Sequence, residues 1–326
     1  MLFIMYIIVN RKLTMKDTEI KKIFKGLYIA RPEFIGCQIK LIKSGHNRSI
    51  YSVITTDNKK YIAKIGNIKK DLGSTSLNDV RVQTFLSEMG CEFIPGIIYS
   101  DKTNDFYMES YVGEQDIAFN DLNNEDIDTF AKQLVFIHNL SPDQYKAFSI
   151  DHGFDEPKIT SLTEGLNTFG FARFEIVKGL CPDKAVKDWI QKHLQQSAAI
   201  LQNKTNSNQT AHLRWGDIGE NLRKDDHTLY FIDWEFAGLG YGSELAYIKI
   251  HSHLDSEKFN FLVSRYAFYS NKTDSDLLDE IKLTEKVTRT NDVVWAAMKW
   301  GESVTPNDIE KYRILTYKRI ELANIL

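Results

Sequence analysis

Residues 213–246 read LRWGDIGENLRKDDHTLYFIDWEFAGLGYGSELA, and this stretch predicts a β-hairpin flanked by acidic and amide residues. Two short strand-like runs, residues 222–223 and the apolar residues 229–232, enclose Lys-Asp-Asp-His, which is rich in turn-forming residues. A hairpin brings the ends of its strands together, on neighbours about 5 Å apart. We therefore expect Asn221, where the first strand begins, to lie beside Asp233, where the second ends.

Asp217 adds a third oxygen-bearing side chain to this edge of the hairpin. It lies four residues before Asn221, in a loop that contains glycine. Carboxylate and amide oxygens suit Mg²⁺, which is usually held by one or two protein carboxylates together with substrate phosphates. Asp217 and Asn221 could each be an ordinary turn residue, but the spacing of three such side chains favours a metal site.

The segment resembles the catalytic core of the aminoglycoside phosphotransferase and choline kinase family, kinase-fold enzymes that phosphorylate small molecules. Gly216-Asp217, Asn221 and residues 232–235 match the family's His-Gly-Asp loop ending in Asn and its Ile-Asp-Trp/Phe-Glu run. Residues 240–246 resemble the Gly-Asp-Pro and Asp-Leu-Ala stretch that follows. The resemblance implies that Asp217 is the catalytic base and that Asn221 and Asp233 hold Mg²⁺.

The segment departs from the family pattern at two points. Trp215 stands where the family has His, and the interval from Asp217 to Asn221 is four residues rather than five. We expect Trp215 to fill the space of the histidine and to donate a hydrogen bond from its indole. Gly219 gives the shortened loop backbone freedom.

The charge of the chain is close to neutral but unevenly distributed. A net charge of −3 argues against a nucleic-acid-binding protein, which would normally carry a basic domain. Residues 1–114 have 17 basic and 12 acidic side chains, whereas residues 115–326 have 24 and 32. The resulting +5 suits nucleotide phosphates and the −8 suits a cationic second substrate. Chance asymmetry of a solvated surface is the alternative.

Three cysteines, at positions 37, 91 and 181, are too few and too scattered for a disulfide framework, which fits a cytoplasmic protein. The first nine residues are apolar, but this run is about half the length needed to span a bilayer. We expect the natural chain to begin at Met15. Residues 1–14 would then be a non-native or disordered extension, and no stable membrane insertion is expected.

The N-terminal third predicts an antiparallel meander, with strands over residues 39–43, 50–55 and 60–65. Its first turn, residues 44–49, is small and polar, and such a backbone can approach phosphates. Ser44, Gly45 and Ser49 are the candidate nucleotide contacts there. A plain hairpin turn would have the same composition.

Lys64 stands in the middle of an apolar strand, where a buried ammonium needs an anionic partner. It resembles the third-strand lysine of kinase folds, which contacts the α- and β-phosphates and pairs with an acid on the next helix. That helix is expected over residues 77–89, and the family spacing points to Asp79. Glu88 is the alternative partner, and a solvent-exposed lysine is the alternative environment.

Residues 93–99 and 105–113 predict two more strands and a connector. The second resembles the family hinge, where main-chain groups bind adenine. By that resemblance the Glu109 carbonyl and the Tyr111 amide would bind the base, and Met108 would line its pocket. A core strand followed by a loop is the alternative.

After Gly113 the pattern becomes helical. Asn123 or Asn124 can cap a helix that ends near Ile137-His138, and we expect His138 to be structural rather than a metal ligand. Trp295 and Trp300 are five residues apart, about 140° around a helix. We expect both in the core, with a substrate pocket as the alternative for one of them.

Together these features predict an α+β protein of the two-lobed, protein-kinase-like class. Residues 15–113 would form a small antiparallel nucleotide-binding lobe, and residues 114–326 a larger helical lobe whose only clear β element is the catalytic hairpin. We expect a Mg²⁺-dependent phosphotransferase that moves the γ-phosphate of ATP or GTP to a hydroxyl of a small cationic molecule. An aminoglycoside-type antibiotic, which would imply antibiotic resistance, is the first candidate, and choline, another amino alcohol or a sugar metabolite is the next. A nucleotide-binding pseudokinase scaffold is the alternative class, and a monomer or homodimer is expected.

Overall fold

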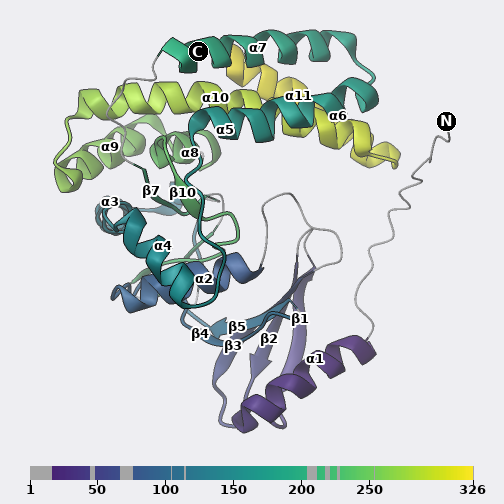
Figure 1. The fold of residues 1–326 in the computed structure, drawn as a ribbon, viewed down its shortest axis with the longest axis vertical. Helices are drawn as coiled ribbons and strands as arrows, with labels where there is room; N and C mark the ends of the chain where they lie inside the picture. The colour runs from purple at the N-terminus through teal and green to yellow at the C-terminus, as the bar shows by residue number, and fades with distance from the viewer. Residues whose placement is uncertain are drawn as a thin grey trace.

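The computed structural model describes residues 17–325 apart from 45–47, 67–75, 104, 114, 204–210, 217–220, 226–227 and 253. It combines a five-stranded antiparallel sheet near the N-terminus with a mostly helical remainder, and the two parts form separate lobes (Figure 1). The predicted α+β, kinase-like class is confirmed. No helix within the described ranges is long and apolar enough to cross a membrane.

The sheet of the small lobe has the strand order β1-β2-β3-β5-β4. Its strands are β1 (Gln38–Ser44), β2 (Arg48–Ile54), β3 (Lys60–Gly66), β4 (Ile97–Asp101) and β5 (Phe106–Ser110). The first three are the meander predicted from alternating apolar residues. Helix α1 (Asp17–Ala30) and the short turn Pro32–Phe34 cover one face, where they enclose an apolar cluster with β2, β3 and β5.

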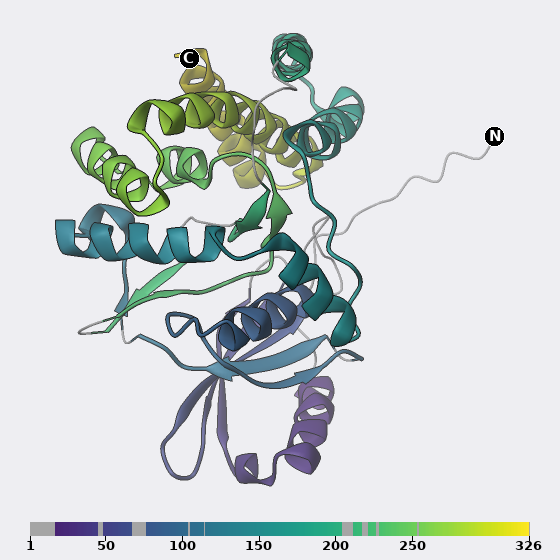
Figure 2. The same cartoon turned by 60° about the vertical axis from the view of Figure 1, so that its left-hand side comes forward.

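Helix α2 (Ser76–Glu88) lies on the other face of the sheet, between the sheet and the helical lobe (Figure 2). It contacts β3, β4 and β5, and through Asn78 it also reaches residues 234–237, the segment after the predicted hairpin. Side chains of α2 and of this face of the sheet are therefore directed at the junction of the two lobes.

The large lobe is built from helices in two groups. The first group holds α3 (Asn124–His138), α4 (Pro142–Asp151), α8 (Glu244–His251) and α9 (Ser256–Ser270). The second holds α5 (Leu162–Gly165), a π-helical turn (Leu166–Phe171), α6 (Ala172–Leu180), α7 (Lys184–Asn203), α10 (Asp274–Glu302) and α11 (Pro306–Asn324). Asn123 caps α3 in a reciprocal capping box with Asp126.

The hairpin formed by β8 (Leu222–Lys224) and β9 (Leu229–Phe231) is present as predicted, with Leu222 opposite Phe231. The prediction that it is the only β element of this lobe is wrong. Strand β6 (Gln115–Asp116) extends it, and β7 (His212–Arg214) pairs with β10 (Gly238–Gly240). These strands have two or three residues, which is too short for an alternating pattern to be visible in the sequence.

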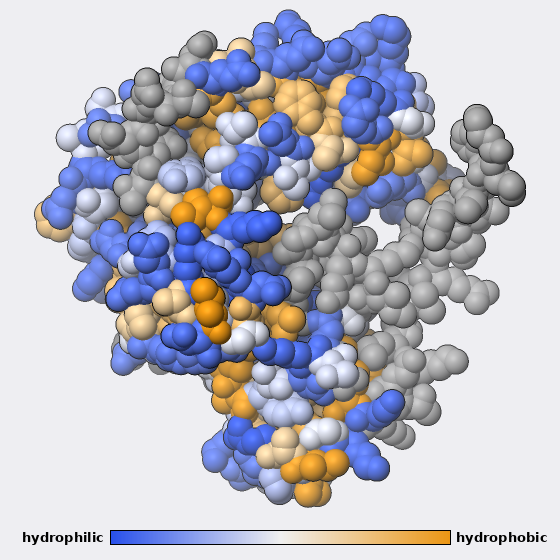
Figure 3. Space-filling view, viewed as in Figure 1, coloured by the Kyte–Doolittle hydropathy of each residue, from blue (hydrophilic) through white to orange (hydrophobic). Residues whose placement is uncertain are grey.

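Three apolar clusters form the core of the described residues, and only the largest contains residues of both lobes. The largest surrounds the hairpin and contains Trp215, Phe231 and Trp234, and a second joins α6, α7, α10 and α11. Trp300 is buried in this second cluster, as expected, whereas Trp295 is only partly buried and packs at its edge. On the face drawn in Figure 3, hydrophilic residues predominate, and hydrophobic ones gather in patches over the upper helices.

Candidate active site

The hairpin brings Asn221 next to Asp233. The amide of Ile232 donates to the carbonyl of Asn221 at 3.1 Å, so the residues at the two strand ends are neighbours as the sequence predicts. Asp233 has a left-handed backbone (φ +62°), which is uncommon outside glycine and recurs at functional sites as well as in turns. Its carboxylate is 29% exposed and faces the junction with the small lobe.

Hydrogen bonds from two side chains of α2 fix the turn after Asp233. The side-chain amide of Asn78 donates to the carbonyls of Glu235 and Ala237, at 3.0 and 2.7 Å. The amide of Trp234 donates to the Asp79 carboxylate at 2.8 Å. These contacts fix the left-handed conformation of Asp233, because the chain on its C-terminal side cannot relax without breaking them.

Asp217, the expected base, lies outside the described residues, but the chain just before it is well fixed. Trp215 is fully buried, and its indole donates to the carbonyl of Ile232 at 2.9 Å. Its ring stacks on Phe231, with the ring centroids 4.6 Å apart. The indole therefore forms the hydrogen bond expected of it, and it ties the strand before Asp217 to the strand before Asp233.

Gly216 is held by a buried carboxylate. Its amide donates to Glu244 at 2.7 Å, and the other oxygen of Glu244 lies 2.8 Å from His138, which also bonds Tyr266 at 2.7 Å. His138 is thus a structural residue of a hydrogen-bonded chain, as expected. A side chain at position 216 is excluded, because a Cβ there would lie 2.3 Å from the carbonyl of Phe236.

Lys64 is buried and lies among carboxylates. Its ammonium is 3.1 Å from Glu109 and 3.8 Å from Asp233, and its side chain is 5% exposed. Burial lowers the pKa of Lys64, but Glu109, Asp233 and Asp79 together outweigh burial and raise it above its usual value. The expected direct pair between Lys64 and Asp79 is not formed, because Glu109 extends from β5 on the same face of the sheet and takes that place.

Asp79 pairs instead with Arg48, a residue that the sequence analysis missed. The Arg48 guanidinium contacts Asp79, lies 3.2 Å from Glu235 and 3.8 Å from Asp233, and donates to the Tyr107 hydroxyl at 3.1 Å. Burial raises the pKa of Asp79 to about 6, although Arg48 and Lys64 act in the opposite direction. The signal was available, because Arg48 and Ile50 share a face of β2 and Ile50 pairs with Lys64.

The other expected nucleotide contacts are placed as follows. The hydroxyls of Ser44 and Ser49 are 3.3 Å apart where β1 meets β2, and Gly45 lies outside the described residues. Tyr111 accepts a hydrogen bond from Arg223 at 3.1 Å, and its ring faces Lys60. Met108 is fully buried against the α1 side of the sheet, so it is not brought together with Lys64.

The donor set at the hairpin fits Mg²⁺. Among the residues described, no group of three or more His, Cys, Asp and Glu side chains could hold a metal by itself. Mg²⁺ does not need one, because it keeps several water ligands and is completed by substrate phosphates. The partly exposed Asp233 carboxylate and the neighbouring residue Asn221 offer oxygen donors of the kind that such a site requires.

We compared the sequence and the fold with those of known proteins. No family model matches the sequence, and no curated protein matches it. Solved structures do match over nearly the whole chain. An ethanolamine kinase from Plasmodium vivax has a TM-score of 0.67 at 15% identity and covers 93% of this chain and 87% of its own. The choline kinase LicA from Streptococcus pneumoniae has a TM-score of 0.62 at 16% identity and covers 93% and 99%.

Other structural neighbours, with lower TM-scores, have names that refer to antibiotics. The streptomycin–ATP–APH(2″)-IIa ternary complex matches with a TM-score of 0.56 at 14% identity, over 94% of this chain and 97% of that one. Identities this low establish the fold alone. The chain has the kinase-like fold shared by choline and ethanolamine kinases and by antibiotic phosphotransferases.

Proposed function

We propose that this protein is a Mg²⁺-dependent phosphotransferase that moves the γ-phosphate of ATP or GTP to a hydroxyl of a small molecule. The observation that carries the proposal is the buried cluster at the lobe junction, where Lys64, paired with Glu109, lies 3.8 Å from Asp233 at the end of the hairpin. The fold supports it, because its neighbours include kinases and a complex that contains ATP. Residues 15–113 would bind the nucleotide, and residues 114–326 would bind the acceptor.

In this proposal the chain supplies positioning and charge neutralisation, which are the main needs of phosphoryl transfer. Lys64 would bind the α- and β-phosphates, and backbone amides of residues 44–49 would also contact the phosphates. Asn221 and Asp233 would hold Mg²⁺, which supplies neutralisation of the developing phosphate charge. Asp217 would orient the acceptor hydroxyl and accept its proton as the bond to phosphorus forms.

The adenine site is proposed at the connector after β5. The backbone groups of Glu109 and Tyr111 remain the candidates, as the family resemblance implies. Asp79 would contribute indirectly, by holding Arg48 and the amide of Trp234.

The test is a coupled assay of ADP or GDP release with Mg²⁺, either nucleotide and a panel of hydroxyl compounds. The panel includes choline, ethanolamine, methylthioribose, amino sugars and aminoglycosides; choline, ethanolamine and aminoglycosides match the names of three of the structural neighbours. An Asp217→Asn enzyme should still bind nucleotide but lose about 10²- to 10⁴-fold in turnover, the usual contribution of a general base. Near-wild-type turnover would show that Asp217 is not the base.

A pseudokinase scaffold is the second candidate, and Trp215 favours it, because an indole replaces the family's histidine beside the base. The two candidates differ in turnover. Mg²⁺-dependent nucleotide consumption with any acceptor supports the kinase, whereas nucleotide binding without consumption across the panel supports the scaffold. Absence of nucleotide binding would contradict both.

A further inference from the structure

Two cations from neighbouring strands lie on the face of the sheet that is directed at the lobe junction. Lys64 is in β3, and Arg48 is the first residue of β2, where the turn after β1 ends. They share a face, because Ile50 pairs with Lys64 and residues two apart on a strand point to the same side. Both are buried, with 6% of Arg48 and 4% of Lys64 exposed. Each buried charge therefore requires acidic partners.

Each cation has its own acidic partner, and both partners are connected to α2. Glu109 lies 3.1 Å from Lys64 and accepts a hydrogen bond from the side-chain amide of Gln83 at 3.1 Å. Asp79 contacts Arg48 directly. Asp79 and Gln83 are four residues apart on α2, so they lie on one face of the helix. Helix α2 is thus connected directly to Arg48 and only through Glu109 to Lys64.

Tyr107 contacts both cations. Its ring centroid is 5.6 Å from the ammonium nitrogen of Lys64 and 5.6 Å from the guanidinium carbon of Arg48, within the range of cation–π contacts. Its hydroxyl accepts a hydrogen bond from Arg48 at 3.1 Å. Because this ring is fully buried, it limits how the two charges can shift relative to each other.

Both cations approach Asp233, but neither forms a hydrogen bond with it. Its Oδ1 lies 3.8 Å from Nζ of Lys64 and 3.8 Å from Nη1 of Arg48. Both distances exceed the length of a hydrogen bond. The attraction of the two cations therefore orients the carboxylate while its lone pairs stay available for a ligand. In this respect Asp233 differs from Asp79 and Glu109, which are in direct contact with a cation of the protein.

Arg48 also reaches the large lobe. Its Nη2 lies 3.2 Å from Glu235, two residues after Asp233. One guanidinium therefore joins α2 through Asp79, β5 through Tyr107 and the segment after the hairpin through Glu235. A planar guanidinium presents several donors in fixed directions and can bind such a set at once, whereas an ammonium is a compact point charge.

We propose that Arg48 is a positioning residue of the Mg²⁺-nucleotide site, and that it fixes the Asp233 carboxylate relative to Lys64 and to the turn of residues 44–49. The proposal rests on the phosphotransferase function proposed above. It gives Arg48 the contact with α2 that the sequence pattern assigned to Lys64. Arg48 acts through Asp233 and is not itself a ligand of the phosphates or of the metal.

A residue that positions a metal ligand should affect the part of nucleotide affinity that depends on Mg²⁺. A direct phosphate ligand would instead affect the affinity equally with and without the metal. Calorimetry on the full chain separates the two roles. The probe is a non-hydrolysable ATP analogue, and its Kd is measured in excess Mg²⁺ and in excess EDTA. The ratio of the two Kd values gives the Mg²⁺ dependence of binding.

Arg48→Lys is the test variant, because it keeps a positive charge beside Asp79 but cannot contact Asp79 and Glu235 at the same time. We expect the Kd in Mg²⁺ to rise about tenfold or more and the Kd in EDTA to change less than about threefold, as for residues that hold a metal ligand in place. Arg48→Met combined with Asp79→Asn removes both buried charges together and should lose the Mg²⁺ dependence in the same way. This double variant decides the question if Arg48→Lys does not fold.

A double-mutant cycle with Asp233→Asn tests whether Arg48 acts through Asp233. In the Asp233→Asn protein, Arg48→Lys should leave the Kd in Mg²⁺ unchanged within about twofold, because the carboxylate that Arg48 positions is already absent. Additive losses would show that the two residues act independently and would overturn the proposal.

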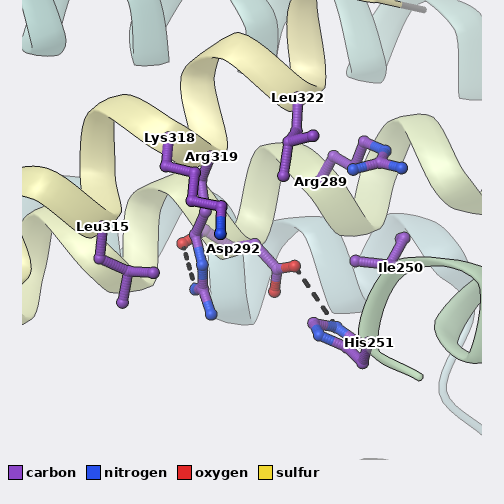
Figure 4. A pocket seen from close by; sticks show the side chains of 8 residues that line it. All are labelled: Ile250, His251, Arg289, Asp292, Leu315, Lys318, Arg319 and Leu322. Carbon is purple, nitrogen blue, oxygen red and sulfur yellow. Dashed lines mark hydrogen bonds and ion pairs between the residues drawn. The ribbon is translucent and has the colours of Figure 1, made fainter. Parts of the chain in front are cut away.

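Arg289→Lys is the matched control for the loss of a buried ion pair. Two guanidinium nitrogens of Arg289 donate to Glu285, whose side chain is 1% exposed. Arg289 lies on α10 in the wall of a pocket between α8, α10 and α11 (Figure 4). This part of the large lobe is turned away from the small-lobe sheet (Figure 1). We expect lower stability in urea unfolding and an unchanged Kd in Mg²⁺. A rise in Kd equal to that of Arg48→Lys would mean that general destabilisation explains both.

The outcomes separate this proposal from the function on which it rests. Absence of Mg²⁺-dependent nucleotide binding by the wild type would contradict the proposed function. If the wild type shows this binding and Arg48→Lys binds equally well in Mg²⁺, the function stands and the role of Arg48 is wrong. If the Kd of Arg48→Lys rises equally in Mg²⁺ and in EDTA, Arg48 binds the phosphates directly and the positioning role is also wrong.

Discussion

Arg48 is the residue on which the organisation of the lobe junction depends most. Its guanidinium is almost fully buried and contacts or approaches three carboxylates, those of Asp79, Asp233 and Glu235. Burial lowers the pKa of Arg48, but Tyr107 and these acids outweigh burial and raise the pKa above its usual value. The side chain therefore stays charged at any working pH. Because the cluster holds more acids than bases, each cation stabilises several carboxylates at once.

Removal of this guanidinium should destabilise the fold strongly. Arg48→Met leaves Asp79 buried without its ion-pair partner, which costs about 3–5 kcal/mol. The double variant Arg48→Met with Asp79→Asn should be more stable than the single one, because the amide removes the unpaired charge and can still accept from Trp234. Urea unfolding measures all variants. Arg313→Met, in an exposed pair, is the control and should leave stability nearly unchanged. Equal losses in the single and double variants would contradict the coupling.

The raised pKa of Asp79 predicts a pH dependence of stability with a definite sign. Its value of about 6 in the fold, against 3.8 for the free side chain, means that the native state holds the proton more tightly than the unfolded chain. The stability that this provides is fully present below the unfolded pKa and is lost as the pH rises through about 6. The unfolding free energy of the wild type minus that of Asp79→Asn, measured by urea unfolding, should therefore decrease from about pH 4 to about pH 7, because the amide does not titrate. A difference that grows with pH would mean that Arg48 lowers this pKa.

At the scale of elements, local sequence patterns predict individual strands and helices, but they do not predict which side chains come together through pairing between strands distant in the sequence. The hairpin β8–β9, the meander β1–β3 and helix α2 follow from local periodicity and turn residues, and all are present. The partner of Lys64 was assigned by spacing along α2, but it is decided by which residue of β5 lies on the same face of the sheet. That register depends on strand pairing across about 45 residues, which no local pattern encodes.

The contact between β7 and the hairpin can be tested through Trp215. Trp215→Phe keeps the stacked ring but leaves the buried carbonyl of Ile232 without the indole donor, which costs about 1–3 kcal/mol. Trp189→Phe is the matched control, because its indole donates to Asn324 at an exposed site, and we expect a loss of less than about 0.5 kcal/mol. Urea unfolding compares the two. Similar losses would indicate that the Trp215 hydrogen bond contributes little and that packing alone fixes the strand.

At the scale of the whole molecule, three free thiols report on different regions. Cys37 is half-buried in the small lobe, Cys91 is buried in the largest cluster, and Cys181 is buried in the second cluster of the large lobe. Burial raises the pKa of Cys91 to about 12 and also raises that of Cys181, which suppresses the reactive thiolate. Iodoacetamide near neutral pH should therefore modify Cys37 first, and the other two only after unfolding. Mass spectrometry of peptides from native and urea-treated protein gives the order, and early modification of Cys91 would contradict the packing around it.

The two lobes are joined by apolar and polar contacts of α2, and the nucleotide should act as a further connection between them. Lys64 and Arg48 come from the small lobe and Asp233 from the large one, and their nearest atoms are 3.8 Å apart. A ligand that binds only the native state stabilises it by about 2.7 kcal/mol at a hundredfold excess over its Kd. A non-hydrolysable ATP analogue with Mg²⁺ should give a stabilisation of this order in urea unfolding, and EDTA should remove most of it. In Asp233→Asn, stabilisation by the analogue should no longer depend on Mg²⁺. Some stabilisation should remain, because Lys64 can still bind the phosphates. If EDTA has no effect on the wild type, the metal does not join the lobes and Asp233 is not its ligand.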